Sequence, residues 1–213
     1  MEFEHPTTSS ASRSASPWTF RHRCARVLWY CIEATIFRFS PRPCYRWRNF
    51  LLRVFGAKID RSCRIRSTVT IEIPWNLTVG AQTAIGDKVI LYCLGPVTIG
   101  DRVTLSQYSH VCAGTHDFTK WTLPLLRPPI EIGDDVWIAT DVFVGPGVKI
   151  GAGAVVGARS SVFKDLPAWQ ICVGSPARPI KERKMSPEMS SIAAAPVQDF
   201  AGSIENRFTP GSM

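Results

Sequence analysis

The feature that most constrains the fold is a period of six residues in the second half of the chain. From Ile132 to Pro167 the sequence divides into the hexads IGDDVW, IATDVF, VGPGVK, IGAGAV, VGARSS and VFKDLP. The first position of each hexad is Ile or Val, the second is Gly or Ala in five of six, and the fifth is never charged. This repetition predicts a parallel β-helix, in which one hexad forms one flat face and three hexads close a triangular turn.

The pattern also predicts the direction of each side chain. We expect the aliphatic first residue to point inward and the small second residue to lie at a tight corner. An α-helix is excluded, because a glycine at every sixth position would destabilise it by about 1 kcal/mol each time. The same step, with insertions, runs earlier through Ile59, Ile65, Ile71, Leu77, Ile85, Leu91, Ile99, Leu105 and Val111.

The phase is lost over residues 117–131, DFTKWTLPLLRPPIE. Three prolines in fifteen residues do not fit a coil face, so we expect an extruded loop, and such loops often carry binding and catalysis. His116 precedes this loop, and histidine is well suited to remove a hydroxyl proton near neutral pH. A structural or solvated histidine is the alternative. Asp117 would either orient the imidazole or the substrate, or cap the loop.

The remaining segments differ in composition from the repeat. We expect a disordered lead at 1–16, a basic amphipathic helical segment at 17–56, a β-helix at 57–185 and a flexible tail at 186–213. Residues 1–66 hold 13 Lys and Arg against 4 Asp and Glu, whereas the rest of the chain holds 12 against 13. Arginines interleaved with aromatic residues fit a solvated or partner-facing surface, or peripheral contact with an anionic membrane. No nucleic-acid-binding motif is present.

Cysteine usage and hydropathy bear on the compartment. The seven cysteines are odd in number, scattered, and never spaced as C-x-x-C, which favours free thiols in a reducing cytoplasm. There is no run of 18 apolar residues and no apolar segment of a signal peptide at the start. We therefore expect a cytoplasmic protein, with peripheral attachment to the inner face of the membrane as an open alternative.

Three motifs together carry a family resemblance. The hexads, the GTHD segment before the loop and the ending VGSPARPIKER resemble hexapeptide-repeat acyltransferases. WRNFLLRVFGAKI, PWNLTVG, GPVTIGDRVTLSQ and PLLRPPIEIGDDVWIA are similar to the colanic-acid-type and nodulation-type sugar O-acetyltransferases, and the likeness covers residues 17–183. It implies a left-handed β-helix with an all-β core, a homotrimer with active sites between subunits, acetyl-CoA as co-substrate without a metal, and a free, nucleotide-linked or lipid-linked sugar as acceptor. The implied setting is exopolysaccharide or surface-glycan synthesis.

The resemblance also implies roles for individual residues. His116 becomes the general base that takes the proton of a sugar hydroxyl as its oxygen attacks the thioester carbonyl. The positions that would contact coenzyme A are Thr140, Ala158, Lys164, Arg178 and Lys181. Phe163 and Ala139 depart from the residues common in relatives, which weakens individual coenzyme contacts without affecting the fold.

The acceptor side is predicted from residue chemistry. Aromatic rings stack on sugars and amides bond to their hydroxyls, which makes Trp75, Asn76, Tyr92 and the loop residue Trp121 candidates. Packing and turn formation are the alternative roles for all four.

Two other functional classes remain. A zinc carbonic anhydrase on this fold needs three histidine ligands, and the repeat offers only His110 and His116. A non-catalytic β-helix scaffold, docking on a membrane or partner through its arginine-rich helices, would be distinguished by its failure to bind acetyl-CoA.

Overall fold

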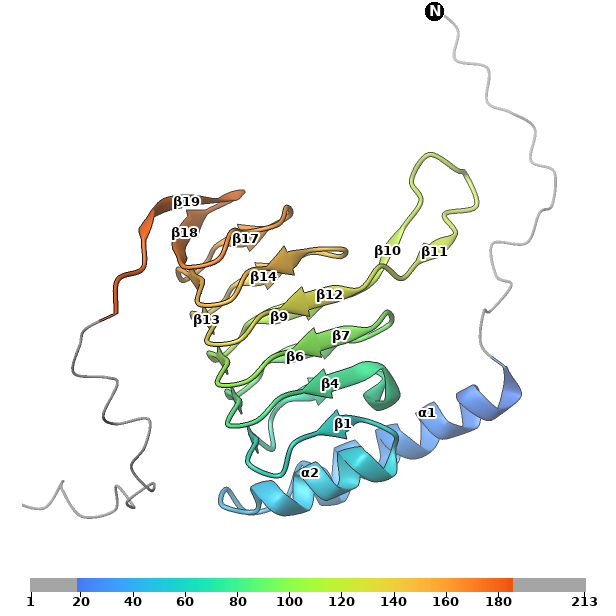
Figure 1. Cartoon of the computed structure of the whole chain (residues 1–213). Helices are drawn as coiled ribbons and strands as arrows, with labels where there is room; N and C mark the ends of the chain where they lie inside the picture. The colour runs from blue at the N-terminus through green and yellow to red at the C-terminus, as the bar shows by residue number, and fades with distance from the viewer. Residues whose placement is uncertain (1–18, 186–213) are drawn as a thin grey trace, which may run out of the picture. The chain divides into compact units, whose positions relative to one another are not determined.

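The structure, a computed structural model, describes residues 19–185 (Figure 1). The predicted lead at 1–16 and the predicted tail at 186–213 lie outside the described residues. The helical elements are α1 (Phe20–Ile32), the π-helical η1 (Glu33–Phe37), α2 (Tyr45–Val54) and the 3-10 turn η2 (Pro74–Asn76). The strands are β1 (Lys58–Ile59), β2 (Arg64–Ile65), β3 (Thr70–Ile71), β4 (Leu77–Val79), β5 (Ala84–Ile85), β6 (Ile90–Tyr92), β7 (Val97–Ile99), β8 (Thr104–Leu105), β9 (His110–Cys112), β10 (Thr115–His116), β11 (Leu125–Leu126), β12 (Ile130–Ile132), β13 (Trp137–Ile138), β14 (Phe143–Val144), β15 (Lys149–Ile150), β16 (Val155–Val156), β17 (Ser161–Val162), β18 (Gln170–Gly174) and β19 (Ala177–Glu182).

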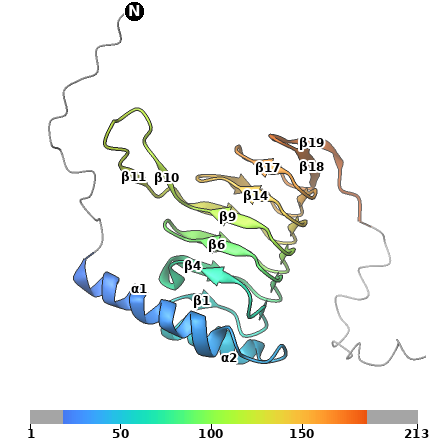
Figure 2. The same ribbon diagram turned by 180° about the vertical axis from the view of Figure 1, so that it is seen from behind.

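The strands form the three faces of a left-handed parallel β-helix, which confirms the predicted fold class (Figures 1 and 2). Sheet A has the order β1-β4-β7-β12-β15, and sheet C has the order β17-β14-β9-β6-β3. Sheet B runs β19-β18-β16-β13-β8-β5-β2, in which only β19 is antiparallel to its neighbour. Trp137 lies opposite Val155, eighteen residues later, so three hexads do close one turn.

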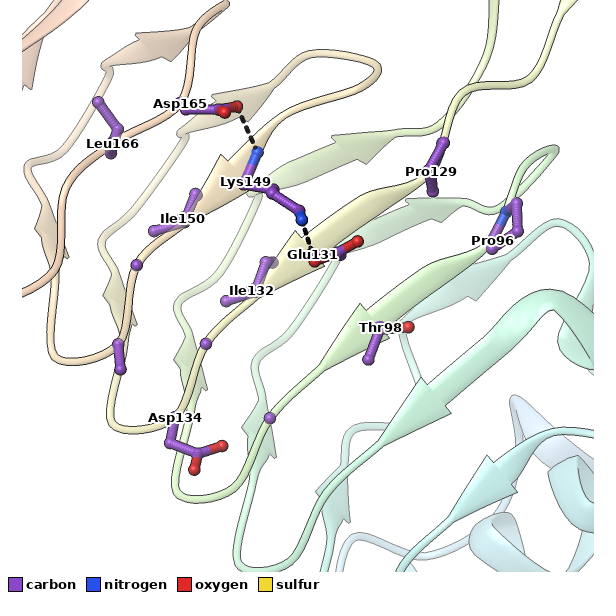
Figure 3. A pocket seen from close by; sticks show the side chains of 14 residues that line it. Pro96, Thr98, Pro129, Glu131, Ile132, Asp134, Lys149, Ile150, Asp165 and Leu166 are labelled. Atoms are coloured by element: carbon purple, nitrogen blue, oxygen red, sulfur yellow. Dashed lines mark hydrogen bonds and ion pairs between the residues drawn. The ribbon is translucent and has the colours of Figure 1, made fainter.

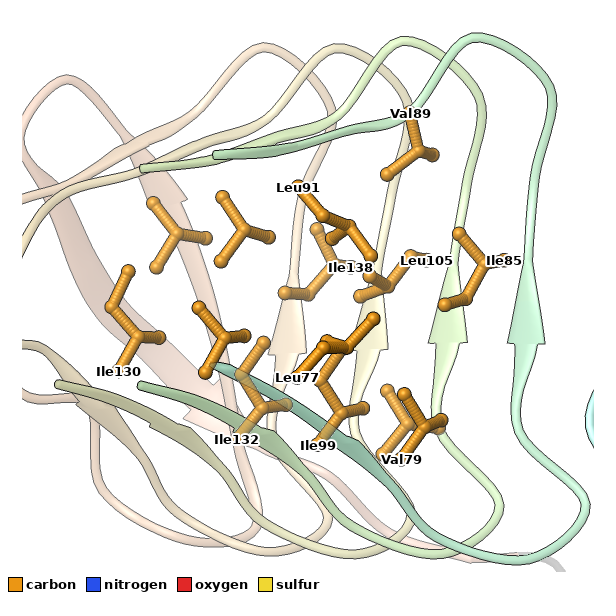
Figure 4. Packing of buried hydrophobic residues seen from close by; sticks show 14 of the residues in the cluster. Leu77, Val79, Ile85, Val89, Leu91, Ile99, Leu105, Ile130, Ile132 and Ile138 are labelled. Carbon is orange, nitrogen blue, oxygen red and sulfur yellow. The ribbon is translucent and has the colours of Figure 1, made fainter. Parts of the chain in front are cut away.

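Aliphatic side chains fill the interior as the repeat predicts (Figure 4). The first-position residues Ile132, Ile138, Val144, Ile150, Val156 and Val162 are all buried. The small second position is a matter of space, because each such residue stands directly against the next turn of the coil. A Cβ atom on Gly151 would lie 2.4 Å from the backbone nitrogen of Ala168, closer than real Cβ atoms approach. A larger residue there would push two turns apart.

The N-terminal helices cover the open end of the coil (Figures 1 and 2). The first turn has no earlier strand to pair with, and such unpaired backbone groups would otherwise recruit another chain. Four side chains donate to its carbonyl oxygens: Arg53 to Ile59 (3.2 Å), Arg48 to Ile65 (2.7 Å), Asn49 to Cys63 (2.8 Å) and Trp29 to Ile71 (2.6 Å). Glu33 completes the set by accepting from the backbone N–H of Ile71 (2.8 Å), and its burial raises the pKa of its carboxyl. The helical segment is therefore a structural cap.

Arg48 is the central residue of this cap. Its side chain is fully buried and no acidic group pairs with it among the described residues. Besides Ile65, its guanidinium donates to the Ser40 hydroxyl (2.8 Å) and to the carbonyl oxygens of Pro41 (2.9 Å) and Arg42 (2.8 Å). Desolvation lowers its pKa, and the four hydrogen bonds offset that cost of burial. Arg48 thus ties α2, the turn before it and the first coil together.

Replacing Arg48 with alanine should destabilise the protein by about 3–5 kcal/mol, because several buried acceptors lose their donor and a cavity remains. Lysine at this position should recover only part of the loss, since an ammonium cannot reproduce the planar fork of donors. Urea unfolding followed by circular dichroism measures both. Arg46, exposed on the same helix, is the matched control, and Arg46→Ala should change stability by less than about 0.5 kcal/mol. A loss below about 1 kcal/mol in Arg48→Ala would contradict the assigned role.

The segment after His116 leaves the coil and returns to it (Figure 1). Its base is a short antiparallel ladder of β10 and β11, with His116 opposite Leu125. The structure differs from the predicted span of 117–131 at the far end, where β12 begins at Ile130. Ile130 is fully buried and its N–H donates to the carbonyl oxygen of Pro96 (2.9 Å), so it already belongs to sheet A.

In the described part of the chain, no helix is long and apolar enough to cross a membrane.

Candidate active site

Two edges of the triangular coil carry the residues of interest. The loop edge is where the chain passes from sheet C to sheet A, and it is marked by Trp75, Gly95, His116, Gly147 and Lys164. The hairpin edge is where the chain leaves the carboxyl ends of the parallel strands of sheet B. It passes there to sheet C at Thr140 and Ala158, and turns back into β19 of the same sheet at Gly174. Six residues of extended chain separate Thr140 from the loop edge, which is at most about 20 Å.

His116 is held in a defined tautomer. Its exposed ring lies on β10, and Nδ1 is 2.6 Å from the carbonyl oxygen of Leu123. A carbonyl oxygen only accepts, so Nδ1 must carry the hydrogen and donate it. In the neutral ring Nε2 then holds the lone pair and can accept a proton.

Leu123 is the residue that aims this carbonyl at the imidazole. Its φ of +46° lies in the left-handed region, which is rare for a residue with a branched side chain. Its N–H donates to the carbonyl oxygen of Lys120 (2.9 Å), which holds the turn closed. Sequence reasoning missed Leu123, and no signal in the sequence marks a leucine for this conformation.

Asp117 caps the loop in this structure. Its carboxylate accepts hydrogen bonds from the Thr119 hydroxyl (2.5 Å) and backbone N–H (3.1 Å), and pairs with Lys120 (3.3 Å). The hydrogen bonds from Thr119 hold the pKa of Asp117 below its usual range. Both oxygens are engaged within the loop, so the geometry favours the capping role over orientation of the imidazole.

Three candidates for the acceptor side also lie along the loop edge or close to it. Asn76 donates through Nδ2 to the carbonyl oxygens of Cys93 and Leu94 (both 3.0 Å), so its amide hydrogens serve the coil. Trp75 stacks on His22 of α1, with ring centroids 5.8 Å apart. These contacts give Trp75 and Asn76 packing roles on at least one side.

Tyr92 lies opposite Cys112 of β9, four residues before the histidine. Its ring and Leu94 cover Gly114, where a Cβ atom would come within 3.3 Å and 2.9 Å of them respectively. Gly114 stands two residues before His116, so this close packing determines where the chain leaves the coil. Burial raises the pKa of the Tyr92 phenol.

The loop presents two aromatic side chains to solvent. Trp121, predicted from the sequence, is 83% exposed, and Phe118 is 87% exposed. Phe118 is not among the residues predicted from the sequence, although its place two residues after His116 in an extruded loop was a usable signal. Rings so exposed gain by being covered by a ligand or another chain.

Most of the predicted coenzyme contacts gather on the hairpin edge. Thr140 and Ala158 lie one turn apart there, since the Arg159 N–H donates to the Thr140 carbonyl (2.9 Å). Arg178 lies opposite Val173 on the β18–β19 hairpin, whose turn continues this edge. Lys181 lies opposite Ile171, further from that turn on β19. The three cations of the predicted set, Lys164, Arg178 and Lys181, are exposed and form no ion pair with any described residue.

Lys164 stands apart from the other coenzyme candidates. It follows sheet C and therefore lies on the loop edge, two turns beyond the point where the loop leaves. Adjacent turns are about 5 Å apart, which places it roughly 10 Å along the axis from that point. A single chain thus brings His116 and Lys164 to one edge and leaves Thr140, Ala158 and Arg178 on the next.

An open groove of about 740 Å³ crosses the outer face of sheet A beside the base of the loop (Figure 3). Pro129 lines it at the loop end and Asp134 at the opposite corner. Its central charges are paired, with Lys149 Nζ 3.0 Å from Glu131 and the Lys149 N–H donating to Asp165 (2.8 Å). None of the predicted site residues lines it.

Among the residues that the structure describes, no group of three or more His, Cys, Asp or Glu side chains is arranged to hold a metal ion.

Comparison with known proteins agrees with the fold and the repeat. Residues 129–164 match the family described as bacterial transferase hexapeptide (six repeats). An Escherichia coli K12 protein that carries the name of a colanic acid biosynthesis acetyltransferase, WcaF, is 54% identical over 156 residues, which cover 73% of this chain and 86% of that protein.

Solved structures resemble the chain at lower identity. Hexapeptide-repeat acetyltransferase VCA0836 of Vibrio cholerae, complexed with acetyl coenzyme A, is 28% identical with a TM-score of 0.70, over 78% of this chain and 91% of that one. A galactoside acetyltransferase in complex with coenzyme A is 25% identical with a TM-score of 0.72, over 79% and 86%. Repeat, fold and sequence identity together show that this chain belongs to the hexapeptide-repeat acetyltransferases.

Proposed function

We propose that the protein is an acetyl-CoA-dependent O-acetyltransferase that modifies a sugar hydroxyl, with His116 as general base. The observation that carries this proposal is the hydrogen bond from Nδ1 of His116 to the Leu123 carbonyl. It leaves Nε2 as the proton acceptor on an exposed ring, beside a loop with two exposed aromatic side chains. A basic nitrogen of this kind is what an alcohol nucleophile needs.

One histidine is enough for both proton transfers of the proposed reaction. Acetyl-CoA supplies an activated acetyl thioester when it is bound. Nε2 of His116 takes the hydroxyl proton of the sugar as its oxygen bonds to the acetyl carbon and the carbon–sulfur bond breaks. The same nitrogen then returns the proton to the departing thiolate, so the enzyme ends in its starting state.

The coenzyme side rests on the hairpin edge. The phosphates of coenzyme A need cations. Arg178 and Lys181 on the β18–β19 hairpin, and Lys164 on the loop edge, have no acidic partner among the described residues. Thr140 and the small, exposed Ala158 lie one turn apart on this edge. Since His116 lies on the neighbouring edge, we propose a homotrimer in which one chain's loop edge faces the next chain's hairpin edge.

The relatives support a glycan as acceptor. The Escherichia coli relative is named for colanic acid biosynthesis, and similar structures include a galactoside acetyltransferase and a maltose O-acetyltransferase. We propose a role in exopolysaccharide or surface-glycan synthesis, with a free, nucleotide-linked or lipid-linked sugar as acceptor. All seven cysteines are free, which supports a reducing compartment such as the cytoplasm.

Thiol release from acetyl-CoA tests the reaction class. Purified protein should release coenzyme A in the presence of a suitable sugar, and mass spectrometry should find the acetyl group as an ester on that sugar. Aminosugars belong in the panel, because N-acetylation would show a different nucleophile. No release with any sugar, together with no binding of acetyl-CoA by calorimetry, would favour the scaffold alternative.

A further inference from the structure

We propose that the outer face of the N-terminal helices docks on an anionic phospholipid membrane. This cap face comprises the exposed apolar residues of α1, η1 and α2 and of the turn between η1 and α2. Its members are Phe20, Val27, Leu28, Ile36, Phe39, Trp47, Phe50 and Val54. The proposal stands on the cap alone and does not depend on the proposed acetylation reaction.

The first observation is an exposed apolar stripe on α1 that does not face the coil. The side of this helix that faces the coil is occupied by Trp29, which bonds to Ile71. On other sides, Phe20, Val27 and Leu28 follow one another at helical spacing and are 76%, 62% and 55% exposed. Cys24 and Cys31, also exposed, continue the same stripe. Burial in the chain does not account for this second apolar face.

The same arrangement recurs on α2. Arg48 and Leu52 point toward the coil and are fully buried, whereas Trp47, Phe50 and Val54 are exposed at spacings of three and four. The rings of Trp47 and Phe50 stack with centroids 5.9 Å apart. Trp47 also donates to the carbonyl of Ile36 (3.4 Å), which joins the exposed surface of α2 to that of η1. Both helices rest on one end of the coil, so their exposed sides form one terminal surface (Figure 2).

The second observation is the charge around this surface. Residues 19–66 contain twelve Lys and Arg but only Glu33 and Asp60 as acids. Glu33 is buried under the cap, and Asp60 accepts hydrogen bonds from Ser62. Two acids from outside this range also contribute, since Arg26 pairs with Glu72 and both Arg42 and Arg66 pair with Asp87. The cations still outnumber all of these acids, and the excess positive charge attracts anions over a distance of about 10 Å.

An arginine pocket gives this charge a defined place. Arg46, Arg53 and Arg61 line a recess of about 300 Å³ together with Phe50 of the cap face. None of the three arginines pairs with a carboxylate among the described residues. One guanidinium nitrogen of Arg53 donates to the Ile59 carbonyl oxygen, and the other N–H groups of this side chain can bind a ligand. A recess of guanidinium groups beside an exposed ring fits a phosphate headgroup whose acyl chains meet the apolar surface.

Charge complementarity decides between a membrane and a second copy of this chain. Two cap faces brought together would oppose two strongly basic surfaces, because Asp60 is the one exposed acid among residues 19–66. An anionic bilayer offers the opposite sign, and Arg with Trp and Phe is the composition of helices that lie in the membrane interface. The combination of apolar area and charge is therefore matched by a lipid surface.

Sedimentation of the full chain with vesicles tests the proposal. The protein should co-sediment with vesicles containing phosphatidylglycerol and much less with pure phosphatidylcholine, and added salt should weaken the binding. Arg46→Gln/Arg61→Gln should lower the affinity about 30-fold, because each arginine near an anionic surface contributes roughly a factor of five. Lys149→Gln/Arg159→Gln, which removes the same charge from exposed positions several turns away from the cap, should change it less than about 3-fold.

The apolar part is tested by Val27→Ser/Leu28→Ser. Both positions are exposed, so the fold should be retained, while vesicle binding should fall roughly 10-fold or more as apolar area is lost from the interface. Equal weakening by the two charge pairs would overturn the proposal, because binding would then follow net charge only. Self-association through the cap without vesicle binding, detected by analytical ultracentrifugation, would also overturn it and assign the face to a second copy.

Discussion

Turnover of the His116→Ala protein is expected to fall by at least about 10²-fold and at most about 10⁴-fold, the usual contribution of a general base. Coenzyme affinity, measured by calorimetry, should remain close to that of the unchanged protein, because the imidazole is not among the groups proposed to hold the coenzyme. The loss should therefore appear in kcat rather than in the binding of acetyl-CoA.

A second substitution separates the base from the loop anchor. In His116→Asn the side-chain amide can still donate toward the Leu123 carbonyl, which the Nδ1 hydrogen does in this structure, but it offers no basic nitrogen. Both variants should be equally slow if His116 is the base. Recovery of most of the turnover in the asparagine variant would show that His116 only positions the loop. His110→Phe is the matched control, since it replaces the other histidine of the repeat within a row of aromatic rings.

In the proposed homotrimer, mixing of chains should recover activity from two inactive variants. His116→Ala removes the base from the loop edge, and Ala158→Trp obstructs the hairpin edge at an exposed position. If each site combines the loop edge of one chain with the hairpin edge of its neighbour, random mixing should restore about a quarter of the unchanged activity, because half of the chains supply each intact edge. Purification of differently tagged chains through both tags verifies that mixing occurred. Because it removes the homotrimers, it should raise the recovered fraction to about a third.

The control for this experiment mixes His116→Ala with His116→Asn chains, in which no interface receives a base. That mixture should remain inactive. A site built within one chain would make both mixtures inactive, and recovery in the first mixture alone would assign the site to two subunits.

The coil could be predicted because its determinants repeat. Ile132 and Ile150 occupy equivalent places one turn apart, so the same packing demand is written many times in the sequence. Gly151 follows from the same repetition, since its Cβ would collide with the next turn. His116 could be proposed as a candidate because it stands where the period fails, and its role as general base stays a prediction that the family resemblance implies.

Non-repeating contacts could not be predicted. The composition of the basic segment predicts an exposed surface. Arg48 is buried instead, and it donates hydrogen bonds to carbonyl oxygens that become its neighbours only after folding. The sequence makes Asn76 a candidate for sugar binding, whereas in the structure its side-chain amide donates hydrogen bonds to carbonyl oxygens of the next turn. The carbonyl of Leu123 depends on a backbone conformation for which leucine has no preference.

The loop of His116 is inserted without any cost to the strand ladders. Trp137 lies opposite Thr104, thirty-three residues earlier, where an uninterrupted turn would need eighteen, and the ladder continues in register on both sides. A solenoid can therefore lengthen one turn at an edge while every other turn stays as it was. Substitutions, duplications or deletions in this segment are shielded from the core, so the loop that we propose to meet the acceptor can change while the scaffold stays the same. Enzymes built this way can acquire new acceptors by changes in a single surface segment.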